Sequence, residues 1–174
     1  YNNILAIILT VLVGVLLFQS ATAQENGQSS NVDYVRPSYK VFRSMSAALA
    51  QPDSVFILEL KGKKFDSFPE GLDKFPNLIV LDLSRNRIKE IPSSVSQLTG
   101  LQELDLSSNK LAGLPKEIGT MTSLRKLSLN RNVITELPAV IGNLQELQVL
   151  ELWDNELSTL PDEMRQLHKL KTLE

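Results

Sequence analysis

Carboxylate side chains recur at a constant spacing from Glu59 to the end of this chain. One position returns every 23 residues and carries Glu59, Asp82, Asp105, Ser128, Glu151 and Glu174. Carboxylates held close together can engage a basic segment of another protein, coordinate an ion such as Ca²⁺, or act as the acid–base pair of a glycosidase. Flanking positions carry basic residues, namely Lys61, Arg85, Lys126 and Arg131. The alternative to all three roles is a solvated face that keeps an exposed sheet soluble.

Trp153 is the only aromatic residue after Phe75. It stands two positions beyond Glu151, where the equivalent residues are all polar: Lys61, Ser84, Ser107 and Asn130. Tryptophan is enriched among the residues that dominate binding energy at interfaces. We therefore expect a protein or peptide site made of Trp153, Asp154, Glu151, Asn130 and Arg131, extended by Asp105 and Asp82. The alternative is an indole that lies flat against neighbouring side chains.

Other reactive groups are scarce. The single histidine, His168, falls in a predicted turn, where a surface position is expected. The chain has no cysteine, which excludes a thiol nucleophile and a zinc–thiolate site, and it has no phosphate-binding glycine motif. Its net charge of −2, from 18 Lys and Arg against 20 Asp and Glu, is far from the basic footprint of a nucleic-acid binder. No cofactor, metal or nucleic acid is expected.

The elements that position these side chains follow from the 23-residue period. Alternation of apolar and polar residues around Leu81 and Leu83, and at the equivalent leucines, predicts a short half-buried strand at the start of each repeat. Prolines then precede a short helical segment, because a proline fits the first turn of a helix: Pro92, Pro115, Pro138 and Pro161. No single repeat can bury its apolar face alone, so neighbouring repeats must stack as parallel strands. The sequence predicts a curved solenoid.

One inward-pointing column of the repeat is polar and contains Asn86, Asn109, Asn132 and Asn155. An asparagine amide both donates and accepts hydrogen bonds, so these side chains can satisfy backbone groups of the turns that stacking removes from water. The first repeat carries Lys63 at this position. A long side chain there can reach solvent, which favours an end repeat.

The pattern L-x-x-L-x-L-x-x-N-x-L-x-x-L-P-x-x-I-x-x-L resembles the leucine-rich repeat family. The resemblance implies an α/β horseshoe with parallel strands on the concave face and short helical or 3₁₀ segments on the convex face. It also implies that the four asparagines form the family's asparagine ladder. On such an open face no carboxylate would be buried enough for acid catalysis, so we predict that the chain is not an enzyme.

Residues 4–18 form an uncharged apolar run, which Ala21-Thr22-Ala23 follows. This arrangement predicts a signal peptide cleaved after Ala23, with a membrane anchor as the alternative. The segment 40–52 resembles the capping helix of many bacterial leucine-rich arrays, and the lack of cysteine also favours an exported bacterial protein over a disulfide-capped one. The last strand stops at Glu174, which suggests a fragment. The expected organisation is a signal peptide at 1–23, a flexible linker at 24–39, a capping helix at 40–52, and repeats at 53–75, 76–98, 99–121, 122–144, 145–167 and, in part, 168–174.

These features predict an exported, non-catalytic module that recognises a protein, a peptide or a surface glycan on its concave face, and is periplasmic, secreted or on the cell surface. One alternative is the recognition domain of a larger receptor or surface enzyme. The protein would contact a membrane only through an uncleaved leader or a missing C-terminal region. The other is an intracellular signalling scaffold, which requires that the leader is not an export signal. The L-P-x-x-I form of the repeat is similar to that of such scaffolds.

Overall fold

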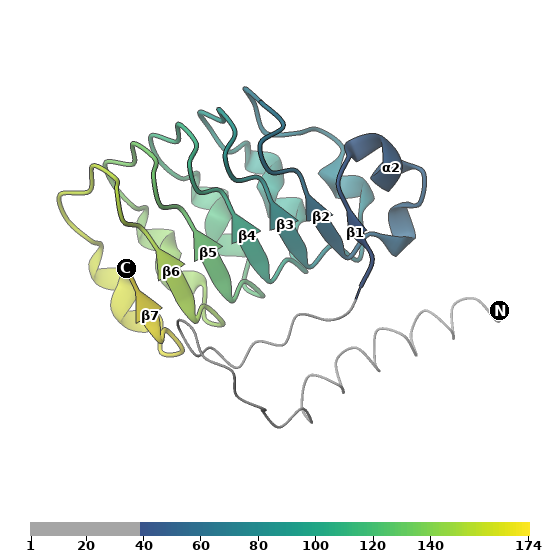
Figure 1. Ribbon diagram of the computed structural model, residues 1–174. Helices are drawn as coiled ribbons and strands as arrows, with labels where there is room; N and C mark the ends of the chain where they lie inside the picture. The colour runs from purple at the N-terminus through teal and green to yellow at the C-terminus, as the bar shows by residue number, and fades with distance from the viewer. Residues whose placement is uncertain (1–38) are drawn as a thin grey trace, which may run out of the picture. The chain divides into compact units, whose positions relative to one another are not determined.

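The computed structural model describes residues 39–174 (Figure 1). The predicted signal peptide and almost all of the predicted linker lie outside the described residues. Residues 39–174 form one compact unit. No helix within them is both long and apolar enough to cross a bilayer.

Seven parallel strands form one sheet in chain order, as the repeat predicts. The strands are β1 (Val41–Phe42), β2 (Ile57–Glu59), β3 (Val80–Asp82), β4 (Glu103–Asp105), β5 (Lys126–Ser128), β6 (Val149–Glu151) and β7 (Thr172–Leu173). From β2 onward each residue pairs with the residue one repeat later, as Leu58 does with Leu81 and Leu81 with Leu104. Paired residues on neighbouring strands are therefore 23 positions apart, which is the length of one repeat. Equivalent residues of successive repeats consequently lie side by side across the sheet.

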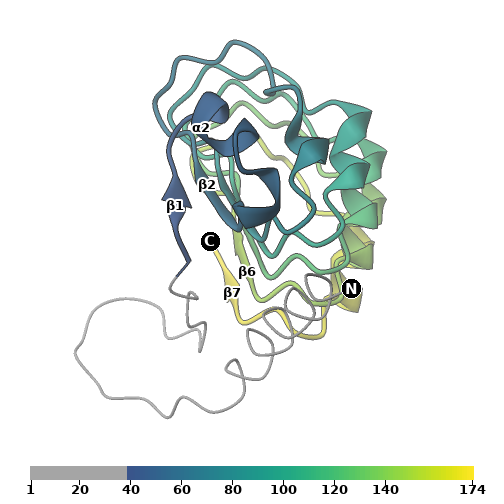
Figure 2. The ribbon, with the colours of Figure 1, turned by 90° about the vertical axis from the view of Figure 1, so that its right-hand side faces the viewer.

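Short 3₁₀ helices lie on the side of the solenoid opposite the sheet (Figure 2). They are η2 (Leu72–Lys74), η3 (Ser93–Gln97), η4 (Lys116–Thr120), η5 (Ala139–Asn143) and η6 (Asp162–Gln166). In η3 to η6 the proline is the N-cap residue, with extended backbone, rather than part of the first turn as the sequence suggested. Its fixed φ suits that position, and its missing N–H leaves no donor to satisfy. The fold is the predicted solenoid of strands and short 3₁₀ segments.

The core runs without interruption between the sheet and the 3₁₀ helices. The leucine columns and the apolar residues of the 3₁₀ helices form one buried cluster, for example Leu81, Leu104, Ile118 and Ile141. Burying one such side chain contributes on the order of 1.5–3 kcal/mol. Stacking of repeats is thus the main source of stability.

The asparagine column links each repeat to the one before it. Asn109 Oδ1 accepts a hydrogen bond from the Ile88 amide at 3.0 Å. Its amide nitrogen donates to the Leu83 carbonyl of the preceding repeat at 3.0 Å and to the Leu106 carbonyl of its own repeat at 2.9 Å. Asn86, Asn132 and Asn155 make the equivalent three contacts. These side chains satisfy backbone groups that stacking takes from water.

Each strand from β2 to β6 leads into a left-handed residue. The first of these is Gly62, and the equivalent residues have φ between 56° and 59° although none is glycine: Arg85, Ser108, Arg131 and Asp154. Such backbone is strained for residues with a Cβ, at about 1–2 kcal/mol each. The cross-repeat hydrogen bonds at these turns hold it in place, such as Arg85 N–H to Ser107 at 2.9 Å.

The segment 40–52 is not one helix, so that prediction is wrong in part. Val41–Phe42 extends the sheet by pairing with β2, and helix α2 covers only Met45–Leu49. Ser44 is the N-cap, accepting a hydrogen bond from the Ala47 amide at 3.2 Å. A β-branched and an aromatic residue favour a strand, and β1 covers the edge that β2 would otherwise expose. The segment still packs at the end of the core, since Phe42 and Ala48 are buried.

Candidate functional site

The concave face of the sheet carries the carboxylate series as a row of register partners. Glu59 pairs with Asp82, Asp82 with Asp105, Asp105 with Ser128 and Ser128 with Glu151. Neighbouring strands lie about 4.8 Å apart, so adjacent members of this row are close enough to interact. The structure therefore places the predicted carboxylates in one row across five repeats, which Ser128 interrupts.

The two ends of this row are neutralised by basic side chains. Glu59 forms an ion pair with Arg43 at 3.2 Å, and Glu151 forms one with Lys126 at 2.8 Å. Within residues 39–174, neither Asp82 nor Asp105 has such a partner. Uncompensated negative charge is thus concentrated at β3 and β4.

Serines two positions further along orient the two aspartates. Asp82 Oδ1 accepts hydrogen bonds from the Ser84 amide at 2.8 Å and from the Ser84 hydroxyl at 2.6 Å. Asp105 Oδ1 accepts from the Ser107 amide at 2.9 Å. The Asp-Leu-Ser order that recurs at Asp82 and Asp105 is the sequence signal for this role, which the column pattern alone does not predict. Each carboxylate is held in a fixed direction before any ligand arrives.

Burial raises the pKa of Asp105 above its usual value of 3.8. The hydrogen bonds from Ser107 oppose that rise, while the nearby charges of Asp82 and Glu151 add to it. Desolvation and like charge both disfavour the ionised form of an acid. A cationic group placed beside Asp105 would favour its ionised form.

Parts of the face are less open than the sequence suggested. Ser84 and Ser128 are buried rather than exposed, and Glu103 in the neighbouring row is only 5% exposed. Strands spaced at about 4.8 Å pack short side chains against their neighbours, which closes these positions to solvent. Within 39–174, no group of three or more acidic or histidine side chains is placed to hold a metal ion.

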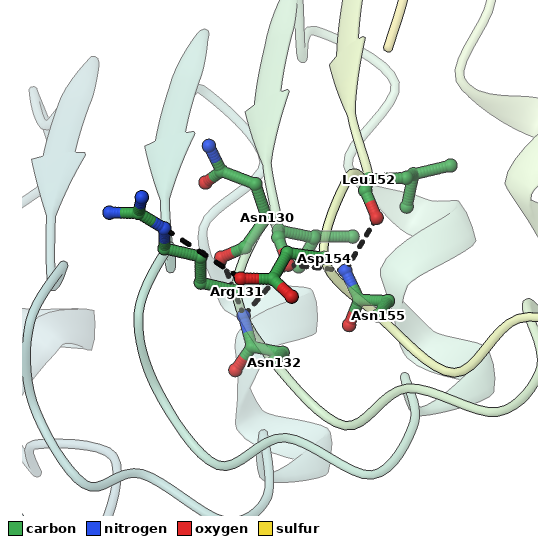
Figure 3. A network of polar contacts seen from close by, with 7 residues as sticks. Asn130, Arg131, Asn132, Leu152, Asp154 and Asn155 are labelled. Atoms are coloured by element: carbon green, nitrogen blue, oxygen red, sulfur yellow. Dashed lines mark hydrogen bonds and ion pairs between the residues drawn. The ribbon is translucent and has the colours of Figure 1, made fainter.

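Trp153 is 40% exposed and lies beside the end of β6. The Arg131 guanidinium sits 4.6 Å from the centre of the indole ring. Figure 3 shows the ion pair that Arg131 forms with Asp154, in which Arg131 Nε lies 3.8 Å from Asp154 Oδ2. The backbone joins the same residues, because the Arg131 amide donates to the Trp153 carbonyl at 2.9 Å. The structure thus brings Trp153, Arg131 and Asp154 together, with one side of the indole covered and the rest accessible.

Asn130 is the residue equivalent to Ser107 and Trp153 in the repeat that lies between theirs. Its Oδ1 is buried without a hydrogen-bond partner, and its side chain points away from that of Asn132 (Figure 3). A buried acceptor without a partner costs about 1–3 kcal/mol. Asn130 is the one predicted site residue whose hydrogen bonding is incomplete within the described part of the chain.

The architecture defines the class: an open solenoid of parallel strands with a charged concave face, a type of scaffold that typically binds other molecules and carries no catalytic centre. Two family descriptions match the chain, "Leucine-rich repeat region" over residues 57–132 and "Leucine rich repeat" over residues 122–174. The chain belongs to the leucine-rich repeat family. Domains of this family typically mediate protein interactions.

Solved structures of the same fold come from several sources. A leucine-rich repeat protein of Leptospira interrogans is 35% identical, with a TM-score of 0.66, over 78% of this chain and 40% of that one. The plant peptide hormone receptor RGFR1 in complex with RGF2 is 34% identical, with a TM-score of 0.55, over 65% and 18%. A TDR receptor is 30% identical, with a TM-score of 0.57, over 69% and 21%. The chain therefore spans less than half the length of each. No curated protein matches the sequence.

Proposed function

We propose that this chain is a non-catalytic module that recognises a protein or peptide on the concave face of its sheet. The observation that carries the proposal is Trp153, a large aromatic side chain that remains 40% exposed where the other repeats carry polar residues. Its neighbours Arg131 and Asp154 hold it in a defined position, which lowers the entropy lost when a partner binds. A similar solenoid, the receptor RGFR1, is described in complex with RGF2, which supports a peptide as the ligand class.

The test is selection of binders from a displayed random-peptide library on the full-length chain. We expect a related group of peptides that bind the wild type and lose about tenfold or more in affinity to Trp153→Ala, as for a hot-spot residue. The matched control is Val133→Ala, which removes another exposed apolar side chain, 43% exposed, from outside the strands. Peptides that bind wild type and Trp153→Ala equally well would contradict the proposal.

A surface glycan is the second ligand class, because exposed tryptophan flanked by polar side chains such as Asp154 and Asn130 also suits a sugar ring. Binding to a glycan array that Trp153→Ala abolishes, with no peptide selected, would replace the peptide by a glycan. The chain can also be the recognition part of a larger receptor or surface enzyme.

Export is part of the same proposal and is supported by the apolar run 4–18 followed by Ala21-Thr22-Ala23. Expression of the full-length protein, fractionation and N-terminal sequencing test it. We expect an extracytoplasmic protein that begins at Gln24. Recovery of the uncleaved protein in the cytosol would favour a signalling scaffold, and recovery in the membrane an anchored protein.

A further inference from the structure

We propose that the peptide bound on the concave face carries a lysine or arginine that docks on Asp82 and Asp105, and an apolar side chain four positions away that packs on Trp153. The inference rests on the proposed function and adds the chemistry of the ligand. It joins two features of one unpartnered sheet face, namely uncompensated charge at β3 and β4 and an exposed indole at β6.

The charge of the face selects a cation. Glu59 and Glu151 are already paired with Arg43 and Lys126, whereas the paired positions Asp82 and Asp105 have no basic partner within residues 39–174. A lysine or arginine side chain placed between these two carboxylates would form charge-assisted hydrogen bonds with both. An acidic ligand would meet two like charges at the same place.

Hydrogen bonds already orient both aspartates before a cation binds. The Ser84 hydrogen bonds occupy Asp82 Oδ1, and no hydrogen bond or ion pair within the described chain involves its second oxygen. Asp105 is directed by Ser107 in the same way. Little side-chain freedom remains to be lost on binding. A bare divalent ion fits less well, since no third acidic or histidine ligand converges on the pair within the described residues.

The opposite end of the surface is apolar. Asp154 compensates the charge of Arg131, and the Arg131 guanidinium covers one side of Trp153. An aliphatic or aromatic side chain of the ligand would cover the exposed remainder of the indole. Between the two ends lies Asn130, whose unpaired Oδ1 can accept a backbone N–H of the ligand once its side chain turns outward.

The distance between the two ends sets the spacing in the ligand. Asp105 lies in β4 and Trp153 follows β6, so two strand intervals of about 4.8 Å separate them, with a further offset of two residues along the strand. The resulting separation is about 10–12 Å. An extended peptide rises about 3.3 Å per residue and points successive side chains to opposite faces, so both side chains face the sheet only at an even separation. Four positions, about 13 Å, is the even separation that fits best.

The experiment uses the full-length chain and a series of fluorescein-labelled, end-blocked peptides. Each peptide has one arginine and one leucine in a serine–glycine background, at separations from two to about six positions. Fluorescence anisotropy measures affinity. Emission of Trp153, the only tryptophan of the chain, reports contact at the indole in matched unlabelled peptides. We expect the tightest binding at a separation of four, and this binding should weaken when NaCl is raised from about 50 to 300 mM.

Replacing arginine by glutamate in the peptide, or making Asp82→Asn with Asp105→Asn in the protein, should weaken binding about tenfold or more. Asparagine keeps the acceptor that Ser84 and Ser107 use, so the double variant should fold. The matched control, Glu117→Gln with Glu136→Gln, removes two negative charges from outside the strands and should bind as the wild type does. Comparison of melting temperatures verifies folding of each variant.

The outcomes separate this inference from the proposed function. Peptides selected on the Trp153 surface that lack a basic residue, or that bind the Asp82→Asn, Asp105→Asn variant unchanged, would overturn the inference and leave the proposed function intact. The inference is also overturned if no arginine–leucine peptide of the series binds. Failure of the whole library on the same protein would instead contradict the proposed function.

Discussion

The guanidinium of Arg131 lies 4.6 Å from the centre of the Trp153 indole, although the two residues belong to different repeats. The contact arises because the register places residue 131 beside residue 154, so the end of one strand meets the end of the next. A cation above an indole contributes about 0.5–1 kcal/mol at a partly exposed site. This pair fixes an exposed aromatic side chain on a surface that is otherwise polar.

Replacement of Arg131 by alanine should therefore expose Trp153 further. We expect a shift of tryptophan emission to longer wavelength and a loss of stability of about 0.5–1 kcal/mol. Arg85→Ala is the matched control, because Arg85 occupies the same left-handed position two repeats earlier and does not touch the indole. Identical emission spectra for wild type and Arg131→Ala would show that the guanidinium does not shield the ring.

The asparagine column supports a second prediction. Asn132→Ala should destabilise the fold by about 1–3 kcal/mol, because it leaves the Leu111 amide without its partner and removes one of the two asparagine donors to each of the Leu106 and Leu129 carbonyls. Chemical denaturation followed by circular dichroism measures the loss. Asn143→Ala, at an exposed site on the convex side, should change stability by less than about 0.5 kcal/mol. Equal effects at the two positions would contradict a special role of the column.

Much of this fold was predictable because the same sequence pattern occurs in every repeat. The leucine columns, the parallel register and the asparagine positions each recur at one spacing, and a recurring pattern fixes both the element and its neighbour. The N-terminal segment was predicted less well, since it occurs once. Helix-forming residues such as Ala47 and Ala48 concealed the strand at Val41–Phe42, which forms only because β2 offers an edge to pair with.

The site was predictable only in its composition. The sequence placed Asp82 beside Asp105 and marked Trp153 as exceptional, but it did not show which carboxylates are neutralised. Arg43 reaches Glu59 from outside the repeats, so no column could reveal that pair. The left-handed residues were also hidden, because only Gly62 among the five carries the glycine that signals such backbone.

Close packing between the 3₁₀ helices supports a third prediction. A Cβ added at Gly142 would lie 2.5 Å from the Glu163 carbonyl oxygen. Gly142→Ala should therefore push η5 and η6 apart and destabilise the fold by about 1–3 kcal/mol. At Gly113 the same change meets no atom within 4 Å, so Gly113→Ala serves as the control. Thermal melting of both variants is the measurement, and a Gly142→Ala protein as stable as Gly113→Ala would show that the repeats can separate at little cost.

The electrostatics of Asp105 give a prediction with a defined sign. Its pKa in the folded chain lies above the usual 3.8, chiefly through burial and with a contribution from Asp82 and Glu151. Between the two pKa values the folded state binds more protons than the unfolded state at this site. The contribution of Asp105 to stability therefore falls as pH rises through that window, and at neutral pH the ionised side chain destabilises the fold.

Asp105→Asn removes the charge and keeps an oxygen for the Ser107 amide. It should raise the free energy of unfolding at pH 7, and this advantage over the wild type should shrink as pH falls through the pKa of Asp105. Denaturant titrations of both proteins at a series of pH values measure the difference in their free energy of unfolding. The other carboxylates are common to both proteins, so their contributions cancel. Asp162→Asn, on an exposed 3₁₀ helix, should show no comparable gain. A constant difference between wild type and Asp105→Asn at every pH would mean that packing, and not the charge of Asp105, separates them.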